Sequence, residues 1–122
     1  MHNLKELKIW NKAILLAKEV HSTTKGFPVE ERYGLQSQIR RASVSIASNV
    51  AEGAGRNSEK EFVHFLSIAN GSAYELQTQL ILSHELRYIT KEKIAGLLQS
   101  LEEIQKMNYG LQNRLIKTKS HI

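Results

Sequence analysis

Three short breaks divide this chain into four long stretches that contain no proline. The first break contains Gly26 and Pro28, the second contains Gly53 and Gly55, and the third ends at Thr90. Glycine permits tight turns, proline cannot continue a helix, and threonine is a common helix cap. The pattern predicts a single domain of residues 1–122, with helices at about 4–25, 33–52, 58–87 and 91–116 and a polar tail at 117–122.

The composition agrees with a small helical domain. Among the 122 residues are one proline, no aspartate and no cysteine, so few residues favour turns or strand ends. A chain of this length has room for one core. Four long helices with short connections pack antiparallel, so we expect an all-α fold, an up-down-up-down four-helix bundle.

Apolar residues recur at intervals of three and four along the predicted helices, which is the pattern of a face turned to a core. The stripe is plainest in the last helix, where Asn108 interrupts it: Ile94, Leu97, Leu98, Leu101, Ile104, Leu111 and Leu115. The third helix has the corresponding set Phe62, Leu66, Ala69, Ala73, Leu76 and Leu80. We expect these residues to form most of the core.

Several helices carry more apolar residues than one core needs, because second apolar lines accompany the core stripes. A second apolar line usually marks a surface for a partner, so we expect a homo-oligomer. A monomer that packs both lines into a thicker core is the alternative. The candidate interface residues are Trp10, Val44, Ala47, Ala51, Val63, Tyr74 and Ile81.

Small residues are concentrated in the second and third helices, and Gly71 lies in the middle of the third. A glycine inside a helix costs about 1 kcal/mol relative to alanine. A close crossing of two helices at Gly71 would offset this cost, and we expect such a crossing. A functional kink at Gly71 is the alternative.

The chain is basic, with 17 Lys and Arg residues against 12 Glu residues and a net charge of +5. An excess of positive charge favours a polyanionic partner such as RNA or DNA. Arginine and hydroxyl groups suit phosphate contacts, and helical spacing places Arg41, Ser45, Ser48 and Glu52 on one line. The candidate nucleic-acid-binding residues are Arg40, Arg41, Arg56 and Lys60.

The same arginines can instead pair within the protein, for example Arg41 with Glu52 or Arg56 with Glu59, and this alternative stays open. Aromatic residues make up 7% of the chain, which leaves few platforms on which bases could stack. Nucleic-acid binding should therefore depend on backbone phosphates and show little sequence specificity. A protein-interaction scaffold that docks an acidic protein or a polymerase is the second functional hypothesis.

Catalytic and metal-binding patterns are sparse. A di-iron bundle needs Glu-x-x-His on two helices, and the pattern occurs once, at Glu61 and His64. The sequence has no G-x-S-x-G motif, no aspartate to orient a histidine and no cysteine. We therefore expect no enzyme activity, no metal and no cofactor. We find neither a signal peptide nor a membrane span, so we expect a cytoplasmic protein without a membrane partner.

Four runs of sequence form a distinctive combination: LKIWNKA at 7–13, FPVEERYGLQSQIRRA at 27–42, SIASNVAEGAGR at 45–56 and EFVHFLSIANGSAYELQTQL at 61–80. Together they resemble the bacterial four-helix bundle proteins, also called 23S rRNA intervening-sequence proteins or the S23 ribosomal protein family. The resemblance covers nearly the whole chain. It departs from the family at Asn70 and Gln77, where an aliphatic residue and a glutamate would be expected.

The resemblance implies a four-helix bundle that assembles into a ring-like homopentamer and has no established catalytic activity. Members resemble proteins encoded inside intervening sequences of 23S rRNA genes. A similar fold serves as the accessory variability protein of diversity-generating retroelements, a basic pentamer that binds nucleic acid and a reverse transcriptase. The Arg-Arg and Glu-Gly-x-Gly-Arg patterns of the family carry over to Arg40, Arg41, Glu52, Gly53, Gly55 and Arg56.

Overall fold

The computed structural model describes the backbone of residues 2–120 and the side chains of residues 2–117. That part of the chain is helical and contains no strand. The elements are the 3-10 helices η1 (Leu4–Glu6) and η2 (Val29–Glu31) and the α-helices α1 (Lys8–Thr24), α2 (Leu35–Ala54), α3 (Glu59–Glu85) and α4 (Lys91–Ser120). The prediction of an all-α fold with four helices is confirmed.

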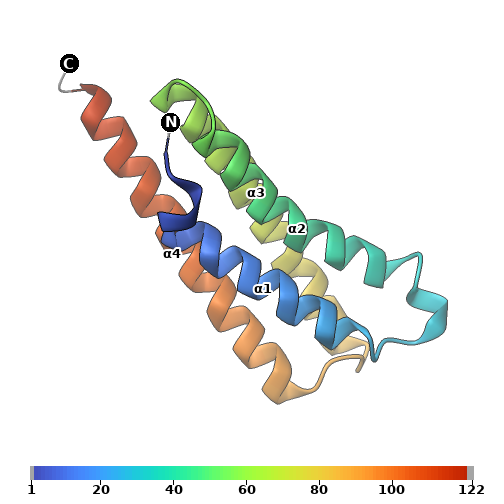
Figure 1. Cartoon of the computed structure of the whole chain (residues 1–122). Helices are drawn as coiled ribbons and strands as arrows, with labels where there is room; N and C mark the ends of the chain where they lie inside the picture. The colour runs from blue at the N-terminus through green and yellow to red at the C-terminus, as the bar shows by residue number, and fades with distance from the viewer. Residues whose placement is uncertain (1, 121–122) are drawn as a thin grey trace.

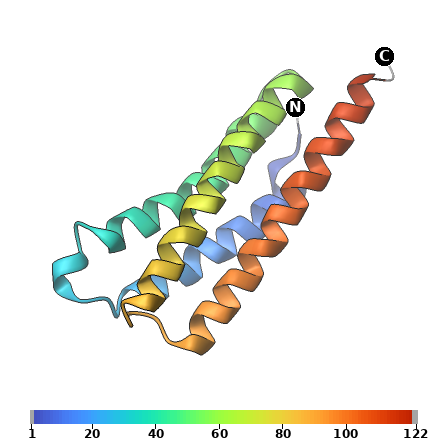
Figure 2. The same ribbon diagram turned by 180° about the vertical axis from the view of Figure 1, so that it is seen from behind.

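Successive helices run in opposite directions and lie side by side (Figures 1 and 2). Helix α1 packs against α2 and α4, and α3 packs against the same two helices. Each helix therefore has two neighbours, as in an up-and-down four-helix bundle. None of the described helices combines the length and the hydropathy that crossing a bilayer requires.

The helix ends differ from the predicted ones at three places. The first predicted helix is interrupted, because Leu7 is extended (φ −79°, ψ 114°) and separates η1 from α1. Helix α2 begins at Leu35 rather than at residue 33. The predicted tail over 117–122 is wrong through Ser120, where α4 ends, and residues 121–122 lie outside the described residues.

The caps of the last two helices agree with the sequence interpretation. The Ser58 side chain accepts a hydrogen bond from the backbone N–H of Glu61 at 3.1 Å, at the start of α3. The Thr90 side chain accepts one from the N–H of Lys93 at 3.2 Å, at the start of α4. Each cap satisfies one of the backbone donors that a helix leaves without a partner in its first turn.

The core lies along the predicted stripes. Every member of the α3 stripe is buried, and most of the α4 stripe is buried as well, while Leu98 and Leu111 are half-buried against the core. The contributions of the other two helices are Ile9, Ala13, Leu16 and Val20 from α1 and Leu35, Ile39, Ala42, Ile46, Ala47, Val50 and Ala54 from α2.

A polar seam between α3 and α4 explains the interruption of the last stripe. Asn108 is 2% exposed, and its side-chain N–H donates to the backbone carbonyl of Leu66 at 2.9 Å. The Gln112 side chain in turn donates to the Asn108 carbonyl oxygen at 2.6 Å. About one turn before Asn108 on α4, the Gln105 side chain donates to the Gln77 side chain of α3 at 3.0 Å. Gln77, which departs from the family pattern, therefore takes part in the seam.

The close helix approach occurs at Gly53 and not at Gly71. A Cβ added at Gly53 would lie 2.8 Å from Cδ1 of Phe62 and 2.9 Å from Cβ of Phe65. A Cβ added at Gly71 would meet nothing within 4 Å, and this residue is exposed. The predicted crossing at Gly71 is therefore wrong, and α3 continues as a helix through that position.

Candidate nucleic-acid interface

Arg40 is turned toward α1 and closes the end of that helix. Its Nε donates to the Thr24 hydroxyl at 2.8 Å, and its Nη2 donates to the His21 carbonyl at 3.1 Å. The last carbonyls of a helix lack partners inside the helix, and a cation complements the negative end of its dipole. Arg40 therefore joins α2 to α1. The prediction of Arg40 as a phosphate ligand did not anticipate this contact.

Arg41 projects differently, because adjacent residues of a helix lie about 100° apart around its axis. Its side chain is exposed and makes no hydrogen bond or ion pair with residues 2–117, so the predicted pair with Glu52 is not formed. It lies on the side of α2 where Ser45 meets Ser72 of α3, with the two hydroxyl oxygens 2.8 Å apart. An arginine in this position has its full set of donors available for an anion.

Arg56 follows α2 in the turn to α3 and is held by two contacts. Its Nη2 donates to Oε2 of Glu52 at 3.2 Å, and its guanidinium carbon lies 4.8 Å from the centre of the Phe65 ring. The predicted pair of Arg56 with Glu59 is wrong, because Glu59 lies 3.4 Å from the His2 ring nitrogen instead. The arginine is thus fixed by neighbours on α2 and α3.

A hollow of about 540 Å³ opens beside this stacked arginine, and we call its lining the tip cluster: Arg56, Lys60, Glu61, His64 and Phe65. Lys60 and His64 are one helical turn apart on α3 and are both exposed. The His64 ring meets the Phe65 ring edge-on, with the centroids 5.2 Å apart. The structure therefore brings the predicted residues Arg56 and Lys60 together, with an aromatic ring between the helices.

The four predicted residues do not form one site. Arg41 lies 13 residues before Ala54, the last residue of α2, which corresponds to about 20 Å along the helix axis. Two cationic positions therefore exist on the α2–α3 side of the bundle, one at Arg41 and one at the tip cluster. The sequence interpretation missed Phe65 and His64, although the spacing of four between Lys60 and His64 was a signal for one exposed face.

The predicted interface residues lie on two different sides of the bundle. Val44 is 46% exposed on the side of α2 that meets α1, whereas Tyr74 and Ile81 are 57% and 42% exposed on α3 near α4. Ala47 belongs to the core, where it is 5% exposed, so its prediction as an interface residue is corrected. The remaining three residues, Trp10, Ala51 and Val63, are half-buried.

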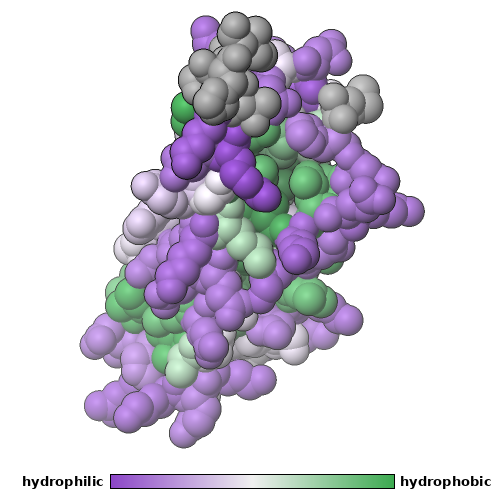
Figure 3. Space-filling view, turned by 90° about the vertical axis from the view of Figure 1, so that its left-hand side faces the viewer, coloured by the Kyte–Doolittle hydropathy of each residue, from purple (hydrophilic) through white to green (hydrophobic). Residues whose placement is uncertain are grey.

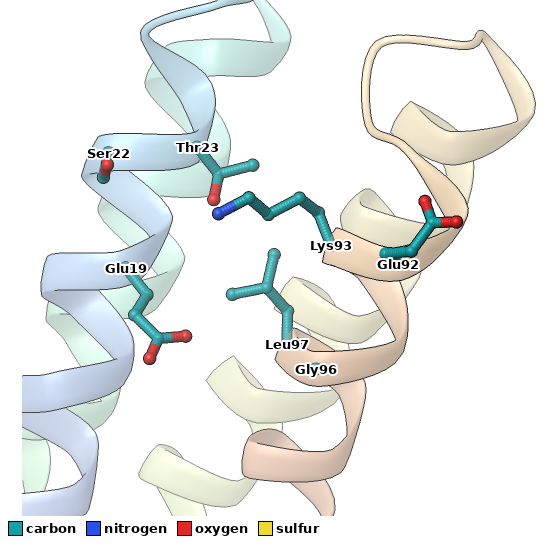
Figure 4. Close-up of a pocket in the computed structure, with 7 residues that line it drawn as sticks. All are labelled: Glu19, Ser22, Thr23, Glu92, Lys93, Gly96 and Leu97. Atoms are coloured by element: carbon teal, nitrogen blue, oxygen red, sulfur yellow. The ribbon is translucent and has the colours of Figure 1, made fainter.

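Two further hollows lie between α1 and α4. Figure 3 shows separate apolar areas among polar side chains. One hollow is lined by the apolar residues Leu7, Ile9, Met107 and Leu111 and by the charged residues Glu6, Lys8 and Arg114. Figure 4 shows a second hollow, where Lys93 of α4 extends toward Thr23 of α1. No three His or Glu side chains of the described residues gather where a metal ion could bind.

The fold defines a class, an all-helical, up-and-down four-helix bundle. The model of the 23S rRNA-intervening sequence protein family matches residues 5–110, and the chain belongs to this family. A crystal structure of a protein of unknown function from the S23 ribosomal protein family of Bacteroides thetaiotaomicron VPI-5482 is similar, with a TM-score of 0.78 and 24% identity. The similarity covers 86% of this chain and 95% of that one, and it shows the fold. The comparison with curated proteins gives no match.

Proposed function

We propose that this protein is a non-enzymatic, basic homo-oligomer of the cytoplasm that binds RNA or DNA through backbone phosphates. The observation that carries the proposal is Arg41, an exposed arginine without a protein partner among the described side chains, on the same side of the bundle as the tip cluster. The net charge of +5 adds long-range attraction for a polyanion. The family takes its name from the 23S rRNA intervening sequence, which makes RNA the first polyanion to test.

Exposed apolar residues on two sides of the bundle support the oligomeric part of the proposal. Val44 lies on the α1–α2 side, and Tyr74 and Ile81 lie on the α3–α4 side. When two different surfaces of one chain fit each other, the copies join head to tail, and they close into a ring where the rotation between copies allows it. The family resemblance implies five copies in that ring. In such an assembly the basic positions of neighbouring copies would act on one ligand together.

A salt series tests the binding. We would measure the affinity of the protein for structured RNA and for duplex DNA at rising salt concentration, with the oligomeric mass determined in the same buffer. We expect log affinity to fall linearly with log salt, and Arg41→Glu to make the slope shallower by at least about one contact while the mass is unchanged. Lys18→Glu, the same charge reversal at an exposed position of α1, is the matched control. An intact oligomer that binds neither nucleic acid at low salt would refute the proposal.

The protein-docking scaffold remains the second candidate, and the connection between α1 and α2 favours it. Val29 and Tyr33 are 74% and 90% exposed there, on either side of the exposed Arg32. Large apolar groups beside a cation suit an acidic protein surface. Partners that stay bound after nuclease treatment, and are lost in Tyr33→Ser, would favour this function over the first.

A further inference from the structure

We infer that the tip cluster is a binding site for a single unpaired nucleotide, whose base stacks on Arg56 and whose phosphate meets Lys60 and His64. The inference rests on the proposed nucleic-acid binding and names the form of nucleic acid that this part of the surface selects. The guanidinium carbon of Arg56 lies over an aromatic ring, at 4.8 Å from the centre of Phe65.

Packing against α2 holds the Phe65 ring in place beneath Arg56. Phe65 is half-buried, and its Cβ lies close enough to Gly53 that no side chain fits between them. The Arg56 guanidinium carbon lies over the Phe65 ring, 4.8 Å from its centre, and Nη2 donates to the carboxylate of Glu52 at 3.2 Å. The arginine side chain is 43% exposed, so the side of the guanidinium that is turned away from Phe65 can meet a ligand.

A nucleobase fits this arrangement because arginine planes and aromatic rings are the surfaces on which unpaired bases stack. The adjoining hollow of about 540 Å³ lies within the range of small-molecule sites. Lys60 and His64 line it from the outer side of α3 and can donate to a phosphate. Glu61 also lines it, near the Ser58 hydroxyl at 3.4 Å, and a carboxylate there can accept from the amino group of a base.

A continuous duplex fits less well, since its bases are stacked on one another and present no face to a protein. A bulge, a loop or a strand end supplies an unpaired base next to a phosphate. The cluster should therefore distinguish RNA with an unpaired nucleotide from uninterrupted RNA, without reading the sequence through hydrogen bonds.

The test uses two blunt-ended RNA duplexes with the same number of base pairs, one fully paired and one with a single-nucleotide bulge, with affinities measured by fluorescence anisotropy over a salt series. We expect the wild-type protein to bind the bulged duplex about tenfold more tightly. Arg56→Lys keeps the charge and loses the planar group, so the preference should disappear while the salt slope stays the same. Arg87→Lys, the same change at an exposed arginine beyond the other end of α3, should keep the preference.

Phe65→Leu is the second variant, because it removes the ring and keeps an apolar side chain; its helix content and melting curve show whether it folds. Loss of the preference in both variants supports the site. Salt-dependent binding without a preference for the bulge, or a preference that persists in Arg56→Lys, overturns this inference and leaves the proposed function standing. Failure to bind either RNA duplex at low salt overturns this inference and the RNA-binding form of the proposed function.

Discussion

At the scale of the residue, one glycine decides how closely α2 and α3 approach at the tip. A Cβ at Gly53 would overlap with Phe62 and Phe65, so the close packing of these two side chains against α2 depends on that empty space. Gly71 has no such neighbour. Substitution of glycine by alanine should therefore have opposite effects on stability at the two positions.

We expect Gly53→Ala to lower the free energy of unfolding by about 1–3 kcal/mol, because the added methyl group overpacks the tip. Gly71→Ala should raise it by about 0.5–1 kcal/mol, because alanine favours the helix and nothing obstructs it. Denaturant unfolding of both variants measures the difference. Equal effects of the same sign at the two positions would contradict the close approach at Gly53.

The adjacent arginines of α2 give a second prediction at this scale. Arg40→Ala should cost about 1–3 kcal/mol of stability, because the Thr24 hydroxyl and the His21 carbonyl lose their donor. Arg41→Ala should change stability by less than about 0.5 kcal/mol, as expected of an exposed side chain without contacts. Thermal or denaturant unfolding separates the two, and a stability loss confined to Arg41→Ala would be inconsistent with this arrangement.

At the scale of the element, the helices were predictable and their ends were less so. Stripes such as Phe62 to Leu80 identify a helix and its buried face, because their spacing matches only that period. The break at Leu7 was not predictable from the apolar spacing, which does not show the hydrogen bonds at this point: the Asn11 side chain donates to the carbonyls of Lys5 and Leu7, both at 3.0 Å. The Arg56 contact with Phe65 was not predictable either, because it depends on how two helices meet.

Tyr88 joins two connections at the end of the bundle away from the tip. Its hydroxyl donates to Oε2 of Glu31 at 3.1 Å, its ring lies 5.3 Å from that of Phe27, and Glu31 also accepts from the N–H of Leu35 at 3.2 Å. The hydrogen bond to Glu31, with smaller effects of burial and of the charges of Glu31 and Glu30, raises the pKa of Tyr88 above the ordinary value of 10.0.

The direction of this shift gives a pH prediction. Because the pKa of Tyr88 is higher in the folded protein than in the unfolded chain, its stabilising contribution is complete below about pH 10 and is lost as the pH rises through the folded-state pKa. Glu31→Gln should bring the pKa of Tyr88 down toward the ordinary value. Ultraviolet titration of the phenolate, with the curve of Tyr88→Phe subtracted as background, measures the pKa of Tyr88 in the wild-type protein and in Glu31→Gln. The same Tyr88 titration curve with and without Glu31 would refute the contact.

At the scale of the whole molecule, Val44 lies on one side of the bundle and the other two exposed interface candidates, Tyr74 and Ile81, lie on the opposite side. Val44→Glu damages the α1–α2 side, and Tyr74→Glu damages the α3–α4 side. If the copies join head to tail, each variant alone should be monomeric, because each lacks one of the two complementary surfaces.

A mixture of the two variants gives the sharper result. The intact α3–α4 side of Val44→Glu can meet the intact α1–α2 side of Tyr74→Glu, so the mixture should form dimers and nothing larger. Light scattering or native mass spectrometry measures this. Dimers formed by one variant alone would show instead that a surface pairs with its own copy.

The stacked arginine at the tip has a thermodynamic consequence for any ligand that binds there. An unrestrained arginine carries about 2 kcal/mol of rotamer entropy, which it loses on forming a complex. Glu52 and Phe65 restrict Arg56 within the protein itself, so much of that loss takes place on folding. Association at the tip then begins from a side chain that is already ordered, which leaves more of the stacking interaction to appear as affinity.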